Sequence, residues 1–580
     1  MNSTATASLL LSLLVTLSFA TAEEIIDDRG IPLSARQYIV DNYMKGVDPL
    51  SQEVDDAFTI LRLPPAIRAA VESLEWEKGQ LQKFEKNKLF GILRCPDGSI
   101  RAIHFRDGKK RNDRKIDESR LRVLQRLYSD DSFTSPPDPI LVKWQAKEVD
   151  PKTVLFDGIA KAHDNPSLRL DGETIRRALK NLMAEKTRSV ELSRALGALA
   201  ESENSDVNCW AAVWLISRMD VMMFARKQRE LSVPDLEAID AQTFYENVFY
   251  AVKARMEFPW AKEVPEKDFL HQVLSPRSTN EPLQRWRRHF YDALSPEVAG
   301  LTIEDMDKVR AVAANAYGDY YQYEGDTTWE DFGMLTSLAV HEGRCEDCSN
   351  VLNSMYRALG IPACQAFTPM WGHCDGNHAW TWIRGGGDVP GDGRNAVKVY
   401  VKTWDGLEDV TSEYTPVTTV EIPTEATTSE KAQLMVWNSG DWHVVARSSI
   451  ADGKAVFANV GCRLDFVLCV RIPGGPERLV DVRKDGSVRT MKLVADEADC
   501  LDVELDKMLP LGEFQPDEEY SIELYGTEGW KEIPSERVWT GALKFKGSPM
   551  CLYRLKGKGM SDRPFTLERS EDGTLVLLKR

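Results

Sequence analysis

Three side chains able to do covalent chemistry follow one another between residues 343 and 405. Cys345 opens a predicted helix, His378 lies in the extended segment NHAWTWI, and Asp405 ends the extended segment VKVYVKTWD. A thiol, an imidazole and a carboxylate in this order can form a Cys-His-Asp acyl-transfer site. The thiol attacks a carbonyl, the imidazole moves the proton and the carboxylate orients the imidazole. This region carries the main functional hypothesis.

The segment after Cys345 predicts a helix whose start favours a reactive thiol. Apolar residues recur at three- and four-residue steps from Cys348 to Leu359, which predicts one face packed against a core. Gly360 fits the left-handed residue after a helix, and Pro362 prevents the helix from continuing. Cys345 then lies at the helix N-terminus, where unpaired N–H groups and the helix dipole favour a thiolate and can stabilise an oxyanion.

The loop RGGGDVPGDGRN, between the two extended segments, predicts a hairpin because it is rich in Gly and Asp. His378 and Asp405 are equidistant from its centre. A symmetric hairpin would therefore set them opposite each other on the same face, within reach. Asp409 would lie beyond His378, so this register selects Asp405 as the third member of the site.

Four motifs occur in order around these residues: G-x-C at the helix start, R-A-L-G-I-P-A at its end, H-A-W on one strand and W-D on the next. Together they resemble the transglutaminase-like superfamily. The resemblance implies a papain-like α+β core, as in transglutaminases, peptide N-glycanases and bacterial cysteine peptidases. It also implies that Cys345 is the nucleophile, His378 the general base and acid, and Asp405 the orienting acid. We expect this chemistry to need no cofactor and no metal.

The resemblance extends upstream but has limits. Residues 192–220 and 269–287 are similar to the helical lead-in of large exported bacterial members with C-terminal β-modules, whereas residues 23–150 have no counterpart. Cys364 follows G-I-P-A where the family usually has Arg. Neither substrate preference nor a second oxyanion donor therefore carries over.

The N-terminus predicts export. An apolar run from Leu9 to Phe19 is too short to span a bilayer and precedes Ala-Thr-Ala, a signal-peptidase site. We therefore expect residues 1–22 to be a removed signal peptide and the mature chain to be secreted or periplasmic. No later segment predicts stable membrane insertion.

Length and pattern predict several domains with an α+β fold. After the signal peptide, we expect an α+β region of unknown role at 23–150, with a hairpin between residues 89 and 105. Helical periodicity over 190–199, 209–225, 241–256 and 303–317 then leads into a transglutaminase-like core over 151–415. Short alternating strands predict one or two β-sandwich modules over 416–580.

The net charge and the residue types limit which classes of partner the sequence predicts. The net charge of −17 argues against nucleic-acid binding, which needs clustered Lys and Arg. A peptide or protein substrate fits the proposed chemistry, and the sequence does not indicate the oligomeric state. A non-catalytic binding or scaffold protein with the same fold is the rival hypothesis.

The ten cysteines leave two further questions open. With Cys345 as a free nucleophile an odd number remains, and a Cys364–Cys374 bridge is the favoured disulfide. Cys345 and Cys348 form a C-x-x-C pair without a second such pair, although Cys348 fits the apolar helix face. A zinc site remains an alternative. Its ligands would come from the following residues: His341, Cys345, Cys348, Cys364, His373, Cys374 and His378.

Overall fold

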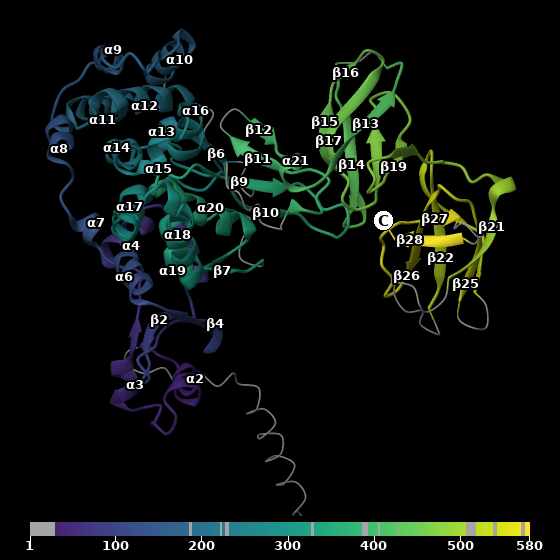
Figure 1. The fold of residues 1–580 in the computed structure, drawn as a ribbon, viewed down its shortest axis with the longest axis horizontal. Coiled ribbons are helices and arrows are strands. Elements are labelled where there is room, and N and C mark those ends of the chain that lie inside the picture. Colours follow the sequence, from purple (N-terminus) through teal and green to yellow (C-terminus); the bar gives the residue numbers. More distant parts are fainter. Residues whose placement is uncertain are drawn as a thin grey trace, which may run out of the picture. The chain divides into compact units, whose positions relative to one another are not determined.

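The computed structural model divides the chain into two compact units, Met1–Ile361 and Pro362–Arg580. Figure 1 shows that helices dominate the first and strands the second. The structure describes residues 30–579 apart from 185–187, 221–222, 227–230, 326–329, 385–392, 404–405, 427–428, 506–517, 538–541 and 570–574. The expected signal peptide and Asp405 lie outside the described residues and stay predictions. The domain boundaries near residues 150 and 415 also stay predictions.

The first unit contains a four-stranded antiparallel sheet in the order β1-β2-β3-β4. Its strands are β1 (Phe58–Ile60), β2 (Lys88–Arg94), β3 (Ile100–Arg106) and β4 (Lys109–Ile116). The hairpin expected between residues 89 and 105 is confirmed by the pairing of β2 with β3. Gly98 adopts a φ of +81° in its turn, a conformation that favours glycine.

Helices form most of the first unit. They are α2 (Leu33–Tyr43), α3 (Gln52–Ala57), α4 (Pro65–Glu72), α5 (Glu75–Phe84), α6 (Glu118–Leu127), α7 (Asp131–Thr134), α8 (Pro139–Gln145), α9 (Pro151–Ala162), α10 (Gly172–Leu182), α11 (Ser189–Glu201), α12 (Ser205–Arg218), α13 (Asp235–Ala238), α14 (Ala241–Glu257), α15 (Pro259–Lys262), α16 (Glu266–Asp268), α17 (Trp286–Val298), α18 (Met306–Tyr320), α19 (Met334–Val340) and α20 (Cys345–Ala358). α14, α17, α18 and α19 all contact α20. Among the described residues, no helix is long and apolar enough to cross a membrane.

Three of the four helices predicted from apolar periodicity are confirmed. The helices expected over 190–199, 241–256 and 303–317 correspond to α11, α14 and α18. The helix expected over 209–225 ends instead at Arg218. Residues 223–226 form strand β5, which pairs with β6 (Leu231–Pro234), so pairing with a nearby strand replaces the helical conformation there.

The second unit begins with a four-stranded antiparallel sheet in the order β10-β9-β11-β12. Its strands are β9 (Ala363–Thr368), β10 (His378–Ile383), β11 (Tyr400–Thr403) and β12 (Gly406–Asp409), and α21 (Thr411–Tyr414) follows. β9 follows the Pro362 that ends the helical segment. It lies between β10 and β11, so these two strands are not neighbours in the sheet.

Two pairs of sheets make up the rest of the second unit, and each pair has three and five strands. The first pair contains β13 (Val417–Pro423), β14 (Ala432–Asn438), β15 (Asp441–Ser448), β16 (Ile450–Ala451), β17 (Lys454–Gly461), β18 (Phe466–Arg471), β19 (Arg478–Val482) and β20 (Val488–Thr490). The second contains β21 (Leu501–Leu505), β22 (Tyr520–Gly526), β23 (Gly529–Ile533), β24 (Ser535–Arg537), β25 (Leu543–Gly547), β26 (Leu552–Gly557), β27 (Phe565–Arg569) and β28 (Leu575–Lys579).

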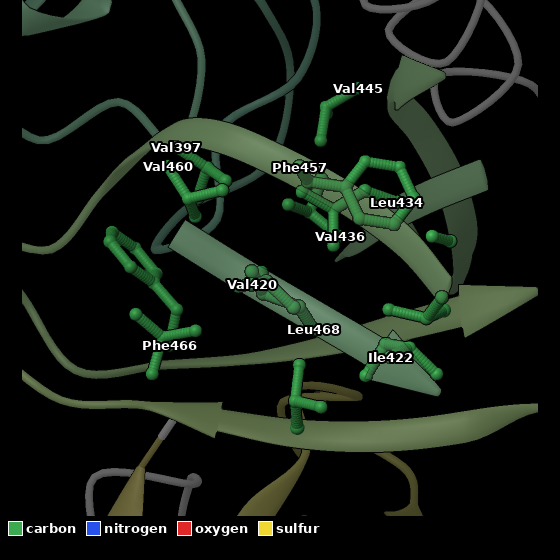
Figure 2. Packing of buried hydrophobic residues seen from close by; sticks show 14 of the residues in the cluster. Val397, Val420, Ile422, Leu434, Val436, Val445, Phe457, Val460, Phe466 and Leu468 are labelled. Carbon is green, nitrogen blue, oxygen red and sulfur yellow. The ribbon is translucent and has the colours of Figure 1, made fainter. Parts of the chain in front are cut away.

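Each pair of sheets encloses one apolar core. In the first pair, Val420 from the three-stranded sheet and Leu434 and Leu468 from the five-stranded sheet belong to one buried cluster, shown in Figure 2. The alternation of apolar and polar residues along the strands therefore marks their buried face correctly. The chain is a mixed α/β protein with many sheets, and the papain-like arrangement of its core stays a prediction.

Candidate active site

Helix α20 begins at Cys345, as the position of Gly343 and Arg344 predicted. Asp347, in the first turn, accepts a hydrogen bond from the Arg344 backbone N–H at 3.0 Å and fixes this start. At the other end, Gly360 has a φ of +72°. Its N–H and that of Ile361 close the helix by donating to carbonyls of the last turn. Both ends of the predicted helix are confirmed.

The Cys345 thiol is partly exposed at this helix start. Its Sγ donates to the Glu346 carboxylate at 3.3 Å. The first-turn N–H groups favour a negative charge here, whereas the carboxylate opposes one, so the two effects compete. Cys348, one turn further, is different: its Sγ faces the Gly343 carbonyl at 3.6 Å, and burial raises its pKa to about 12. A thiol this weakly acidic fits packing rather than nucleophilic chemistry.

A buried polar network lies against the first turn of α20. Arg344 reaches Asp331 at 2.6 Å and Asp347 at 3.4 Å. Asp347 also accepts from the Phe332 backbone N–H at 2.8 Å. Burial, with the charge of Asp331 as the next cause, raises the pKa of the Asp347 carboxyl. One guanidinium thus joins two carboxylates and fixes the residue that precedes Cys345.

The polar face of α20 is buried as well, against residues 277–279. Asn350 donates to Thr279 Oγ1 at 2.9 Å, and Asn353 donates to Ser278 Oγ at 2.7 Å. Arg357 donates to the Arg277 carbonyl at 2.5 Å. We expected α20 to bury only its apolar face. Its polar side chains are buried as well, because residues 277–279 satisfy their hydrogen bonds. The only sequence signal for these contacts was the resemblance of residues 269–287.

The N-terminal sheet contacts the segment that leads to Cys345. Glu342, in β8 (Glu342–Gly343), is fully buried. Its carboxylate lies 3.1 Å from Lys88 Nζ and 3.0 Å from an Arg106 guanidinium nitrogen. Tyr128 donates to the Leu338 carbonyl at 2.7 Å. Residues 23–150, which the sequence left without a role, thus supply the cations that neutralise a buried carboxylate three residues before the thiol.

An exposed aromatic ring also lies near the helix start. Tyr323, in β7 (Gln322–Tyr323), pairs in parallel with Gly343 and is 65% exposed. Partial burial and then the charges of Cys345 and Cys348 raise the pKa of its hydroxyl. The sequence did not single out Tyr323, since its pairing with residue 343 is not visible in the chain.

Buried histidines in the first unit predict an acid-sensitive stability. Burial lowers the pKa of His104 to about 3 and that of His289 to about 4. An unfolded histidine titrates near ~6.5. The stability that a neutral buried histidine contributes is complete above this pH and is lost as the pH falls toward the folded-state value.

Replacing His104 by leucine tests this dependence. Both ring nitrogens of His104 are buried and lack hydrogen-bond partners within the described residues, so removing the ring breaks no such bond there. From pH 7.5 to 5.5, the free energy of unfolding of the parent chain should fall by about 1.4 kcal/mol more than that of His104→Leu. Urea unfolding at the two pH values measures the difference. Equal decreases would contradict a neutral His104 in the folded chain.

In the second unit, His378 is the first residue of β10, as predicted, and pairs with Thr368 of β9. Its half-buried ring lies between two indoles, with centroids 6.3 Å from Trp371 and 5.5 Å from Trp380. Trp380 is fixed in turn, because its Nε1 donates to the Tyr414 hydroxyl at 2.9 Å. Within the described part of the chain, the structure gives the His378 ring no hydrogen bond. The ring is held by aromatic packing.

The register that selected Asp405 is wrong. β10 and β11 were expected to form a hairpin, but each pairs with β9 instead. In this sheet His378 shares a row with Thr368, and the neighbouring row joins Ala379, Phe367 and Tyr400. A shorter connection through residues 369–377 lets β9 pair with β10 first, which the symmetric-hairpin assumption ignored.

Asp409 has a structural environment of its own. It pairs in register with Tyr400, forms an ion pair with Lys398, and accepts from the Thr411 backbone N–H at 3.1 Å. It is therefore engaged with neighbours of β11 and β12. The strand register therefore gives no reason to prefer Asp405 over Asp409 as the third member of the site. Asp405 stays a prediction that rests on the W-D motif.

The cysteine chemistry is simpler than the sequence allowed. All ten cysteines lie within the described residues and none of them forms a disulfide, so the expected Cys364–Cys374 bridge is wrong. Cys364 is buried in β9 opposite Trp382, whereas Cys374 is exposed in the turn before β10. Over the described ranges, no group of three His, Cys, Asp or Glu side chains is placed to hold a metal ion. The zinc alternative therefore finds no ligand set in that part of the chain.

Comparison with known proteins identifies the region that holds the thiol and the imidazole. A family model described as the transglutaminase-like superfamily matches residues 292–389. The matched segment includes Cys345 and His378 and ends before Asp405. It confirms the resemblance seen in the motifs. Neither the curated proteins nor the solved structures contain a match to this chain.

Proposed function

We propose, from the transglutaminase-like domain at residues 292–389, that this chain is a cysteine-dependent enzyme that cleaves or transfers amide bonds. Cys345 is the nucleophile, His378 the general base and acid, and Asp405 the acid that orients the imidazole. The observation that carries the proposal is a partly exposed thiol at the start of a buried helix inside the matched segment.

The first half-reaction forms a thioester. His378 accepts the proton of the Cys345 thiol, and the sulfur attacks the carbonyl carbon of an amide. N–H groups in the first turn of α20 and the helix dipole stabilise the resulting oxyanion. The carbon–nitrogen bond breaks as His378 gives the proton to the leaving amine.

The second half-reaction regenerates the thiol. His378 takes a proton from water, the hydroxide attacks the thioester, and the carbon–sulfur bond breaks to give a carboxylic acid and the thiolate, which takes the proton back from His378. An amine in place of water would give transfer. We favour hydrolysis, because bulk water is the default acceptor and the sequence indicates no amine-binding pocket. Peptide, isopeptide, peptidoglycan stem-peptide and glycosyl-asparagine amides all fit this chemistry, so the substrate is a peptide or protein that includes cell-wall or glycan-linked ones.

Selective alkylation tests the nucleophile without knowledge of the substrate. We expect substoichiometric iodoacetamide at pH 7 to label Cys345 first, as peptide mapping by mass spectrometry would show. Cys374 is the internal control: it is exposed, but burial of its sulfur raises the pKa of its thiol. Accessibility alone would therefore favour Cys374, whereas activation favours Cys345.

The outcomes separate the rival functions. Labelling of Cys374 before Cys345, with unchanged labelling in a His378→Gln variant, would contradict the proposal and favour a non-catalytic binding or scaffold protein. Stoichiometric zinc in the purified protein, with Cys345 protected until a chelator is added, would favour the metal alternative.

We also propose that the mature protein is secreted or periplasmic and starts at Glu23. The apolar run and the Ala-Thr-Ala site support this. Sequencing the N-terminus of protein expressed with its full leader tests it. A mature chain that still carries residues 1–22 would contradict it.

A further inference from the structure

A tight turn over residues 371–376 comes directly before β10 and His378. The Trp371 backbone N–H donates to the Gly376 carbonyl at 3.0 Å and closes the turn. Gly376 has a φ of +88°, which a residue with a side chain rarely adopts. The turn thus fixes how the chain enters the strand that begins at His378.

Asn438, the last residue of β14, binds this turn through its whole amide group. Its Nδ2 donates to the carbonyls of Trp371, Cys374 and Gly376, each at 3.0 Å. Its Oδ1 accepts from the Gly376 backbone N–H at 3.0 Å. Asn438 is fully buried, so water cannot replace these bonds if the side chain is removed.

Arg563, between β26 and β27, binds the same turn from the second pair of sheets. Its guanidinium donates to the Gly372 carbonyl at 3.1 Å and to Asp375 Oδ1 at 3.3 Å, and the residue is 5% exposed. Gly372 also packs against the first pair of sheets, since a Cβ there would lie 2.8 Å from Phe466, a member of the core in Figure 2. Both β-modules therefore hold the turn.

Trp371 connects the turn to the imidazole. Its indole is stacked with the His378 ring at 6.3 Å and an interplanar angle of 28°. Two of its main-chain groups are fixed, the N–H by Gly376 and the carbonyl by Asn438. A displaced turn would move the indole away from His378 and leave that side of the imidazole open to water.

We propose that Asn438 and Arg563 are positioning residues for His378, which act through the turn at 371–376 and the ring of Trp371. This gives the C-terminal β-modules a role: they hold the imidazole of the site from a distance. The catalytic part of this role rests on the proposed function, whereas the positioning itself does not.

The test observes His378 directly. Protein labelled with ¹³C at histidine Cε1 gives eight signals, one for each histidine, and a His378→Gln variant assigns the one of interest. We expect Asn438→Ala and Arg563→Met each to shift or broaden the His378 signal and to move its titration midpoint. A role in stability alone would lower the melting temperature and leave the His378 signal of the folded protein unchanged.

Matched controls come from the same chain. Asn181 is another buried asparagine that donates to two main-chain carbonyls, at 3.0 and 3.2 Å, but in the first unit. Arg554 pairs with Glu523 in the second unit without touching the turn. Asn181→Ala and Arg554→Met should leave the His378 signal unchanged.

The outcomes are distinguishable from those for the proposed function. An unchanged His378 signal in folded Arg563→Met and Asn438→Ala would overturn the positioning role, whatever the reactivity of Cys345. If Asn438→Ala does not fold, Arg563→Met alone decides, because it removes fewer hydrogen bonds to the turn. Where amide hydrolysis is measurable, kcat should fall by up to about 100-fold at an unchanged KM.

Discussion

A Cys345→Ala variant is expected to lose amide hydrolysis by about 10⁴-fold or more in kcat/KM, because no other group on α20 can form the thioester. Cys348 has its pKa raised to about 12 by burial and cannot take over. Release of amine from a panel of peptide amides, with glutamine and glycine acyl donors, measures the loss.

Cys348→Ala is the matched control for this experiment. It removes a thiol one turn away on the same helix, whose Sγ meets the Gly343 carbonyl at 3.6 Å. We expect its kcat/KM to stay within about threefold of the parent value, since a weakly acidic thiol that packs within the fold acts as a small hydrophobe. Residual hydrolysis in Cys345→Ala above a tenth of the parent rate would rule out Cys345 as the nucleophile.

The parts of the fold set by local signals were predictable from the sequence. Helix α20 follows from the spacing of its apolar residues, and its end from Gly360 and Pro362. The β2–β3 hairpin follows from the turn residues near Gly98. Each of these signals acts within a few residues of the structure that it determines, so a single sequence contains it.

Strand pairing was not predictable in the same way. His378 was placed correctly on a strand, but its neighbour was taken to be the next extended segment rather than the previous one. The choice depends on which pairing buries the apolar faces of β9, including Cys364 and Ala366, and alternation along one strand does not contain that information.

The polar contacts around α20 were invisible for a further reason. The bond from Asn350 to Thr279 joins residues 71 apart, and that from Arg357 to Arg277 joins residues 80 apart. The sequence of α20 alone predicts that water hydrates its polar face. In the folded chain, residues 277–279 replace that water, so the helix that carries the thiol is buried on two sides.

Replacing Arg277 by methionine is therefore expected to lower the free energy of unfolding by about 3–5 kcal/mol. Arg277 is buried, forms an ion pair with Asp235, and donates to the Glu281 carbonyl at 3.0 Å. Asp235 is fully buried as well. Without the guanidinium its charge would have no counter-ion among the described residues, and a buried unpaired charge destabilises the fold more than the smaller side chain does.

A double variant separates the effect of the unpaired charge from that of the altered packing. In Arg277→Met with Asp235→Leu, both charges are gone and the volume is kept. We expect the double variant to recover most of the free energy of unfolding that Arg277→Met loses. Urea unfolding of the parent, both single variants and the double variant measures this recovery. If the double variant loses as much free energy of unfolding as the two single variants together, the ion pair with Asp235 is not what Arg277 contributes to stability. The destabilisation would then come from the loop at 277–279, whose main chain Arg357 binds.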